Sequence, residues 1–121
     1  SEGWLCRALS DALHCTPCCH VHSCIRFLHY FEEGGLLAPH LDLSKTDPTS
    51  GRRSTHTLLV YLATCSSGGE TVLMESLEPG CRALATVKPR RGRMLVFPHE
   101  CPHRAEEVVE APKLVIRGEV C

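Results

Sequence analysis

The sequence has few aromatic residues and no dominant charge. One Trp, two Tyr and three Phe make up 5% of its residues, and the formal net charge is −1. Without a basic excess, no electrostatic field draws the chain to nucleic acid or to a membrane surface. No apolar run approaches the ~20 residues that span a bilayer, and no signal-peptide pattern opens the chain. We therefore expect neither a nucleic-acid partner nor a membrane segment in this chain.

The remaining composition fits a small globular protein. Hydrophobic residues make up 43% and charged residues 22% of the chain, both ordinary values for a soluble domain. A chain of 121 residues forms one domain with a modest core. Ser1 stands where an initiator methionine would, so we expect a processed N-terminus or a boundary inside a larger protein. The composition does not predict an oligomeric state.

The nine cysteines are an odd number without regular spacing. Five lie before residue 25, and the other four are dispersed: Cys65, Cys81, Cys101 and Cys121. Such a set does not predict a disulfide framework. It indicates free thiols in a reducing compartment, so the cytoplasm or nucleus is favoured over a secretory lumen.

The apolar pattern changes from helical to strand-like near residue 25. Residues 4–14 carry apolar side chains at helical spacing, and Pro17 should end that helix. About eight short segments follow, each bounded by Gly, Pro or charged residues. They are 25–31, 38–44, 55–63, 71–74, 83–87, 93–97, 103–109 and 113–120.

This order of segments predicts a mainly β fold. No second helical pattern is long enough for βαβ units, so the strands should form a double-stranded β-helix, or jelly roll, after a short N-terminal helix. We place the helix and a Cys/His-rich lead-in at 1–24 and the jelly-roll domain at 25–121.

His40 and Asp42 are separated by one residue on a predicted strand. Side chains alternate along a strand, so both should face the same side. With His103 they form the two imidazoles and one carboxylate typical of non-heme Fe(II) oxygenases. The same three groups also suit zinc, so the ligands alone do not choose the metal. His99 is the alternative to His103, and the spacing to Lys113 favours His103.

Two cations follow on one predicted strand. Lys113 and Arg117 are four residues apart and should project to one face, where they need a counter-anion because unpaired buried charge is costly. A dicarboxylate that chelates the metal at its other end would supply it. The alternative is that both side chains extend to solvent at a sheet edge. Tyr30 and Tyr61 offer hydroxyls to the same carboxylate, or else are core aromatics.

Six stretches of the chain stand in the order and spacing of a known family. They are R-F-L-H-Y at 26–30, P-H-L-D at 39–42, T-L-L-V-Y-L at 57–62, G-G-E-T at 68–71, G-R-M-L-V-F-P-H at 92–99 followed by His103, and K-L-V-I-R-G-E-V at 113–120. Together they resemble the Fe(II)/2-oxoglutarate-dependent dioxygenases of the prolyl 4-hydroxylase type. The resemblance covers residues 22–120, and six ordered motifs are more specific than any one of them.

The resemblance implies a hydroxylase that uses Fe(II), 2-oxoglutarate and dioxygen. The implied catalytic residues and iron ligands are His40, Asp42 and His103. The implied 2-oxoglutarate-binding residues are Lys113 as the carboxylate partner, Arg117 and Tyr61 as co-binders, and Tyr30 as a further candidate. The reaction would hydroxylate a C–H bond of a protein or peptide substrate, a peptidyl proline or a related side chain, and give succinate and carbon dioxide. L-Ascorbate stays open as an additional cofactor.

The chain also departs from the family pattern. Leu114 stands where the family carries an aromatic residue, Gly118-Glu119 replaces Thr-Asp, and the segment before the predicted barrel is shorter. Two other functions stay open. One is a jelly-roll binding module that keeps the metal ligands without turnover, and the other is a His2Asp zinc hydrolase that acts through metal-bound water.

Two further segments have more than one interpretation. The stretch 15–24 has enough Cys and His for a structural zinc, although such sites usually join two separated pairs of ligands. A redox pair there is disfavoured because Cys15 follows the predicted helix, which leaves plain thiols. The polar loop 45–53, directly after Asp42, is a candidate substrate lid or an ordinary solvated loop.

Overall fold

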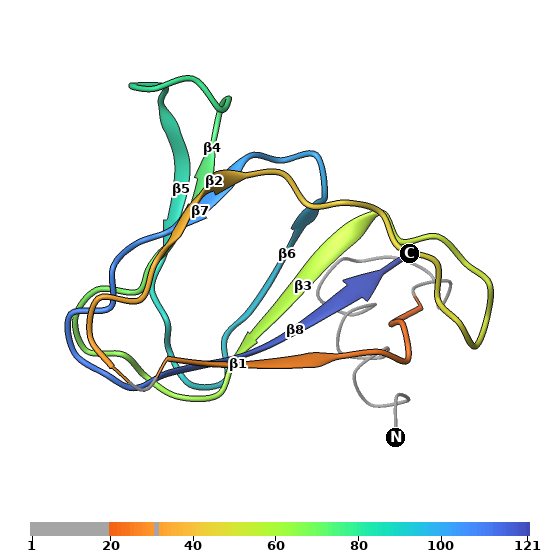
Figure 1. The fold of residues 1–121 in the computed structure, drawn as a ribbon, viewed down its shortest axis with the longest axis horizontal. Helices are drawn as coiled ribbons and strands as arrows, with labels where there is room; N and C mark the ends of the chain where they lie inside the picture. The colour runs from red at the N-terminus through yellow and green to blue at the C-terminus, as the bar shows by residue number, and fades with distance from the viewer. Residues whose placement is uncertain (1–19, 31) are drawn as a thin grey trace.

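The computed structural model describes residues 20–30 and 32–121, which form eight β-strands and no helix (Figure 1). The strands are β1 (Arg26–Tyr30), β2 (Leu37–His40), β3 (His56–Tyr61), β4 (Thr71–Met74), β5 (Ala83–Val87), β6 (Met94–Pro98), β7 (His103–Ala105) and β8 (Lys113–Val120). The helix predicted at 4–14 and most of the lead-in lie outside the described residues. Within the described residues there is no helix long and apolar enough to cross a membrane.

The strands pair into two antiparallel four-stranded sheets. The first sheet has the order β1-β8-β3-β6 and the second has the order β2-β7-β4-β5. Figure 1 shows them as two separate layers, and the chain passes from one to the other at almost every connection. This exchange of strands between two facing sheets is the jelly-roll arrangement. The predicted fold class is thus confirmed.

The two faces of the first sheet have different roles. On β3, Thr57 and Leu59 line a cavity between the sheets, so Leu58 points to the opposite face. There Leu58 is fully buried and packs with Val21 and Val120 in the apolar core. Val21 also pairs with Val120 through an isolated β-bridge. This apolar cluster therefore lies behind the sheet, whereas the cavity face carries polar groups beside buried apolar residues such as Phe97 and Val115.

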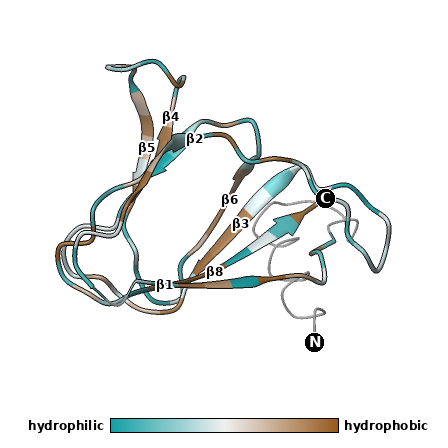
Figure 2. Ribbon diagram, viewed as in Figure 1, coloured by the Kyte–Doolittle hydropathy of each residue, from teal (hydrophilic) through white to brown (hydrophobic). Residues whose placement is uncertain are grey.

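Hydrophilic residues gather at one end of this sheet. Figure 2 shows them at the start of β3 and toward the end of β8. The register explains the coincidence, because Thr57 pairs with Glu119 and Leu59 with Arg117. Residues on β8 that line the cavity alternate with residues that do not, so Lys113 and Arg117 share the cavity face.

Candidate metal and co-substrate site

Every strand except β5 contributes side chains to the cavity between the two sheets. Apolar residues from both sheets form most of its wall, and the polar and aromatic hydroxyl-bearing residues in its lining are Tyr30, His40, Asp42, Thr57, Thr71, His103, Arg104, Lys113 and Arg117. Such a cavity, mostly apolar with a few converging polar groups, is the usual form of a small-molecule site.

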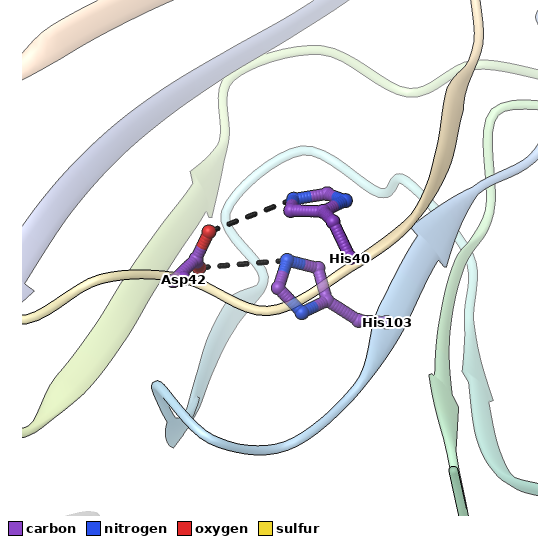
Figure 3. A group of neighbouring side chains, drawn as sticks. All are labelled: His40, Asp42 and His103. Carbon is purple, nitrogen blue, oxygen red and sulfur yellow. Dashed lines mark ion pairs between the residues drawn. The ribbon is translucent and has the colours of Figure 1, made fainter. Parts of the chain in front are cut away.

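The three predicted metal ligands meet at one end of the cavity. His40 ends β2 and His103 begins β7, and the sheet register places the two residues directly opposite each other. Their ring centroids are 4.2 Å apart. The Nε2 atoms lie 3.5 Å and 3.4 Å from the two carboxylate oxygens of Asp42. One ligand atom from each residue falls within 4.8 Å of the others, and Figure 3 shows the three side chains turned toward one another.

Asp42 reaches this position in a different way from the one expected. Strand β2 ends at His40, so the prediction of a strand over 38–44 that carries both ligands was wrong beyond that residue. The backbone N–H of Asp42 instead donates to the carbonyl of His99, 3.1 Å away and just past the end of β6. The chain is crossing from the second sheet to the first at this point. Asp42 is therefore held by the end of β6 and not by the alternation of β2.

The Nδ1 atom of each histidine, the ring nitrogen that does not face Asp42, already makes a hydrogen bond. His40 Nδ1 donates to the Ala38 carbonyl at 2.7 Å and His103 Nδ1 donates to the Cys101 carbonyl at 3.0 Å. A proton on Nδ1 leaves the Nε2 of a neutral imidazole with a lone pair, and burial lowers the pKa of His103, which favours the neutral ring. Two imidazole lone pairs then face one carboxylate. A cation between them would remove the repulsion among three acceptors, as in metal sites whose histidines are oriented by their second nitrogen.

Asp42 is kept ionised by its surroundings. Burial alone would raise its pKa, but a hydrogen bond from Thr57 and the charge of Arg117 lead the effects that hold the pKa below its usual range. The Thr57 hydroxyl donates to Oδ2 at 2.6 Å, and an Arg117 guanidinium nitrogen lies 3.0 Å from Oδ1. A metal ligand must be deprotonated, so this carboxylate is ready for that role.

Lys113 lies at the other end of the cavity without a carboxylate of the described residues in ion-pair contact. The residue is only 3% exposed, and burial lowers its pKa. The ammonium lies over the ring of Tyr30, 5.1 Å from the centroid. A buried cation without a carboxylate is costly, and its place on the cavity wall makes an incoming anion the natural partner.

The G-G-E-T turn makes room for Lys113. Gly68 and Gly69 both have positive φ values, 77° and 73°, which favour glycine. A Cβ on Gly68 would lie 2.2 Å from the Glu107 carbonyl oxygen, and one on Gly69 would lie 3.1 Å from Lys113 Cδ. Two glycines are thus needed here, one for the turn and one beside the lysine stem.

Arg117 is already paired at the metal end. Beside its contact with Asp42, it lies 3.6 Å from Glu119, which also meets Arg26 at 3.2 Å and Lys45 at 3.5 Å. Its Nε is buried without a hydrogen-bond partner among the described residues. The two predicted cations therefore share a face but differ in how their charge is balanced.

The two predicted tyrosines lie in different surroundings. Tyr30 lines the cavity beneath Lys113. Tyr61 is fully buried outside the lining, and its hydroxyl shares a 2.6 Å hydrogen bond with Thr71, which does line the cavity. Burial raises the pKa of both tyrosines. The sequence interpretation did not single out Thr71, although its place at the end of G-G-E-T was a usable signal.

His99 lies behind the metal end, and its two ring nitrogens face hydroxyl groups. Nε2 is 2.6 Å from the Ser54 hydroxyl and Nδ1 is 2.8 Å from the Thr57 hydroxyl. Burial lowers the pKa of this imidazole. None of these hydroxyls was predicted to have a role at the site. Thr57 opens the T-x-L-x-Y-L motif, whereas Ser54 follows the polar loop and carries no motif.

The loop 45–53 is organised around a buried carboxylate. Asp47 accepts hydrogen bonds from the hydroxyls of Ser23 and Ser50 and from the ring nitrogen of His20. These contacts, led by the one from Ser23, hold the pKa of Asp47 far below its usual range. The loop is therefore tied to the lead-in at residue 23, and its role as a substrate lid stays a prediction.

The Cys/His-rich stretch is described only from His20 onward. Cys24 is exposed, and the backbone of His20 exchanges hydrogen bonds with Cys121. The other cysteines of this stretch lie outside the described residues, so zinc and plain thiols both stay open.

Comparisons with known proteins agree with this geometry. Residues 25–118 match the 2OG-Fe(II) oxygenase superfamily, so the chain belongs to that family, and the resemblance inferred from the sequence motifs is confirmed. Membership implies Fe(II) and 2-oxoglutarate as the metal and co-substrate. No curated protein sequence matches the chain.

Solved structures share the fold at low sequence identity. A Pseudomonas putida prolyl-4-hydroxylase aligns with a TM-score of 0.59 and 22% identity over 78% of this chain and 49% of its own. A viral collagen prolyl hydroxylase from Paramecium Bursaria Chlorella virus-1 aligns with a TM-score of 0.65 and 17% identity over 98% of this chain and 69% of its own. A 2OG-Fe(II) oxygenase family oxidoreductase from Burkholderia pseudomallei aligns with a TM-score of 0.68 and 14% identity over 94% of this chain and 50% of its own. This chain thus spans about half to two thirds of their lengths.

Proposed function

We propose that the protein is an Fe(II)- and 2-oxoglutarate-dependent dioxygenase that hydroxylates a C–H bond of a protein side chain, a peptidyl proline or a related residue. The observation that carries the proposal is the pairing of two features in one cavity. Three acceptor atoms converge at one end, and a buried cation without a carboxylate partner among the described residues stands at the other.

The donor set fits a ferrous ion. His40, Asp42 and His103 would hold Fe(II) through two neutral imidazole nitrogens and one carboxylate oxygen, a facial set that leaves coordination positions open. When bound with 2-oxoglutarate and dioxygen, the iron supplies the oxidising chemistry that yields succinate and carbon dioxide. The protein's own contribution is to orient these ligands through the Ala38 and Cys101 carbonyls and through Thr57.

Lys113 fits the distal carboxylate of the co-substrate. The lysine and the metal ligands line the same cavity, so a dicarboxylate bound at the metal end has a cation to meet at the other. Tyr30, which lies under the ammonium group, would fix the direction of the lysine stem and offer its own hydroxyl. Arg117 supports the metal end through Asp42, which makes Lys113 the main carboxylate contact in this proposal.

The substrate class is inferred from two structures with the same fold and from a groove beside the metal end. Two structures with the same fold are prolyl hydroxylases by their descriptions, which supports a peptide substrate. The face beyond Asp42 carries a groove with the exposed apolar residues Leu41 and Leu43 on its wall, and this groove would receive such a peptide next to the metal. No feature of the described residues supports a role for L-ascorbate, which stays a prediction, as does the cellular compartment.

Anaerobic titration with Fe(II) and then 2-oxoglutarate tests the proposal. A weak visible charge-transfer band should appear only when both are present, and admission of air should produce succinate. Adding proline-containing peptides should increase succinate formation and add the mass of one oxygen atom to the peptide, whereas the same peptides with alanine in place of proline should not react.

Two results would contradict the proposal. Zinc-dependent hydrolysis that ignores 2-oxoglutarate would favour the zinc hydrolase, which uses the same three ligands but has no need of Lys113. Binding of Fe(II) and 2-oxoglutarate without succinate formation, with any peptide, would favour a binding module without turnover.

A further inference from the structure

We propose that Ser54, His99 and Thr57 form a one-way chain of hydrogen bonds that aims a proton at Asp42, and that His99 is thereby a positioning residue for the metal carboxylate. The inference goes beyond the proposed function in assigning these three residues, and it rests on that function only for the identity of Asp42 as a metal ligand.

The first step concerns the single proton of the Thr57 hydroxyl. Its oxygen lies 2.6 Å from Asp42 Oδ2 and 2.8 Å from His99 Nδ1, and one O–H can serve only one of them. An ionised carboxylate accepts and never donates. The Thr57 proton must therefore point to Asp42 for that bond to exist, and the Thr57 oxygen must accept from His99.

The second step fixes the tautomer of His99. A donating Nδ1 carries the ring proton, so Nε2 of the neutral imidazole has the lone pair. That lone pair accepts from the Ser54 hydroxyl at 2.6 Å. The Ser54 oxygen in turn accepts from the backbone N–H of Lys45 at 2.9 Å. Each donor in the chain has one acceptor, and the direction of every bond follows from the one before it.

Burial makes this direction matter. Ser54 is 2%, Thr57 1% and His99 5% exposed, so water does not replace a misdirected bond. In the other tautomer, Nδ1 would hold a lone pair and draw the Thr57 proton away from Asp42. That leaves a buried carboxylate oxygen short of a donor, and an unsatisfied buried group costs more than a normal hydrogen bond contributes.

The backbone of His99 strengthens the same assignment. Its carbonyl accepts the N–H of Asp42 at 3.1 Å, and its own N–H donates to Thr55 at 3.0 Å. His99 thus fixes the backbone of Asp42 directly and its carboxylate through Thr57. Because β2 ends before Asp42, these two contacts replace the strand as the source of its position.

The chain also reaches the polar loop. Ser54 follows this loop, where its carbonyl accepts from Ser44 at 2.6 Å and its hydroxyl accepts from Lys45. A change at the ends of this loop that moves Ser54 would therefore alter its hydrogen bond to His99 and, through Thr57, the hydrogen bond to the Asp42 carboxylate.

Metal affinity tests the Thr57 step. Co(II) binding is followed by visible absorption, because it needs neither oxygen nor turnover. Thr57→Val keeps the shape and removes the proton, and we expect roughly 10- to 100-fold weaker binding, the usual effect of losing a group that orients a metal ligand. Thr57→Ser restores the hydroxyl and should bind within a few-fold of the wild type. Equal Co(II) affinity in Thr57→Val and the wild type would overturn the proposal.

The tautomer of His99 tests the direction of the chain. Nitrogen-15 NMR of the wild-type protein without added metal should show a neutral imidazole protonated on Nδ1, assigned to His99 by its loss in His99→Gln. An Nε2-protonated ring would overturn the one-way chain. This measurement is made on the wild-type protein and does not depend on metal binding, so it decides the inference even if the proposed oxygenase function fails.

Discussion

The two ends of the cavity balance their charges in opposite ways. At the metal end, the Asp42 carboxylate has a guanidinium, a hydroxyl and two imidazoles around it. At the lysine end, Lys113 is buried over the ring of Tyr30 with no carboxylate of the described residues to meet it. The metal end is preorganised to hold a metal ion through side chains of the protein alone. The lysine end, in contrast, is incomplete without an anion.

This difference separates structural from binding charges. A paired buried charge contributes to the fold, since removing one partner leaves the other uncompensated. An unpaired buried charge lowers stability, and proteins tolerate such exceptions mainly at functional sites. Arg117 is a paired charge of this kind, whereas Lys113, four residues away on β8, is an unpaired one. Substitutions at the two ends should therefore affect metal binding, co-substrate binding and stability in different proportions.

The largest effect should come from removing a ligand at the metal end. We expect His40→Ala to weaken Co(II) binding more than 100-fold, beyond the roughly 10- to 100-fold typical of residues that only orient a ligand, and to abolish 2-oxoglutarate decarboxylation. Titration calorimetry and succinate formation measure the two results. Cys24→Ser, at an exposed cysteine, is the control and should match the wild type. Retained turnover in His40→Ala would remove that residue from the metal.

The next effect should come from the lysine end. Lys113→Met should raise KM for 2-oxoglutarate by roughly 10- to 100-fold, because a hydrogen bond to a charged group contributes about 1.5–3 kcal/mol, while Co(II) affinity stays near the wild-type value. The same variant should be as stable as the wild type or more stable, because an uncompensated buried charge is removed.

Lys88→Met, at an exposed lysine, is the matched control and should change neither KM nor stability. A large loss of stability in Lys113→Met with an unchanged KM would mean that the lysine supports the fold and does not bind the co-substrate.

A smaller effect is expected from the second cation. Arg117→Met should lower the free energy of unfolding by about 1–3 kcal/mol, because Asp42 and Glu119 each lose a buried partner. Its KM for 2-oxoglutarate should rise less than that of Lys113→Met. Urea denaturation and steady-state kinetics give the two values, with Arg53→Met at an exposed position as the control. An increase in KM as large as that of Lys113→Met would place Arg117 on the co-substrate and remove the difference between the two ends.

The strands were predictable where turn residues enclose them. The bounds of β4, β5 and β8 agree with the predicted segments 71–74, 83–87 and 113–120, because Gly, Pro and charged residues mark both ends of β4 and β5 and Pro112 precedes β8. The strand predicted at 103–109 stops instead at Ala105, and Val108 bridges to Gly68 outside any named strand. That partner lies on a distant turn, so local sequence gives no sign of it.

The sequence predicted the residue types of the candidate site but not the contacts that hold them in place. The spacing of His40 and Asp42 indicated a metal pair, but the strand ends between them, since the backbone of Asp42 bonds to His99 in another part of the chain. The Thr57 hydroxyl acts on Asp42 only because the fold brings β3 beside it. Neighbours in the sequence indicate which groups are present, whereas the direction of their hydrogen bonds depends on the assembled sheets.

The smallest effect should appear as a dependence on pH at the lysine end. Only the ammonium form of Lys113 attracts a carboxylate, and burial lowers its pKa below the ordinary 10.5. KM for 2-oxoglutarate should therefore rise with increasing pH as the pH passes through that lowered pKa. In Lys113→Arg the guanidinium stays protonated throughout, so its KM should stay flat over the same range. The ligand-free protein should become more stable over the same range in which it binds the co-substrate less well. Between the lowered pKa and 10.5 the unfolded chain binds more protons than the folded one, so the free energy of unfolding rises with pH. Identical pH profiles for the wild type and Lys113→Arg would show that the lysine charge does not govern co-substrate binding.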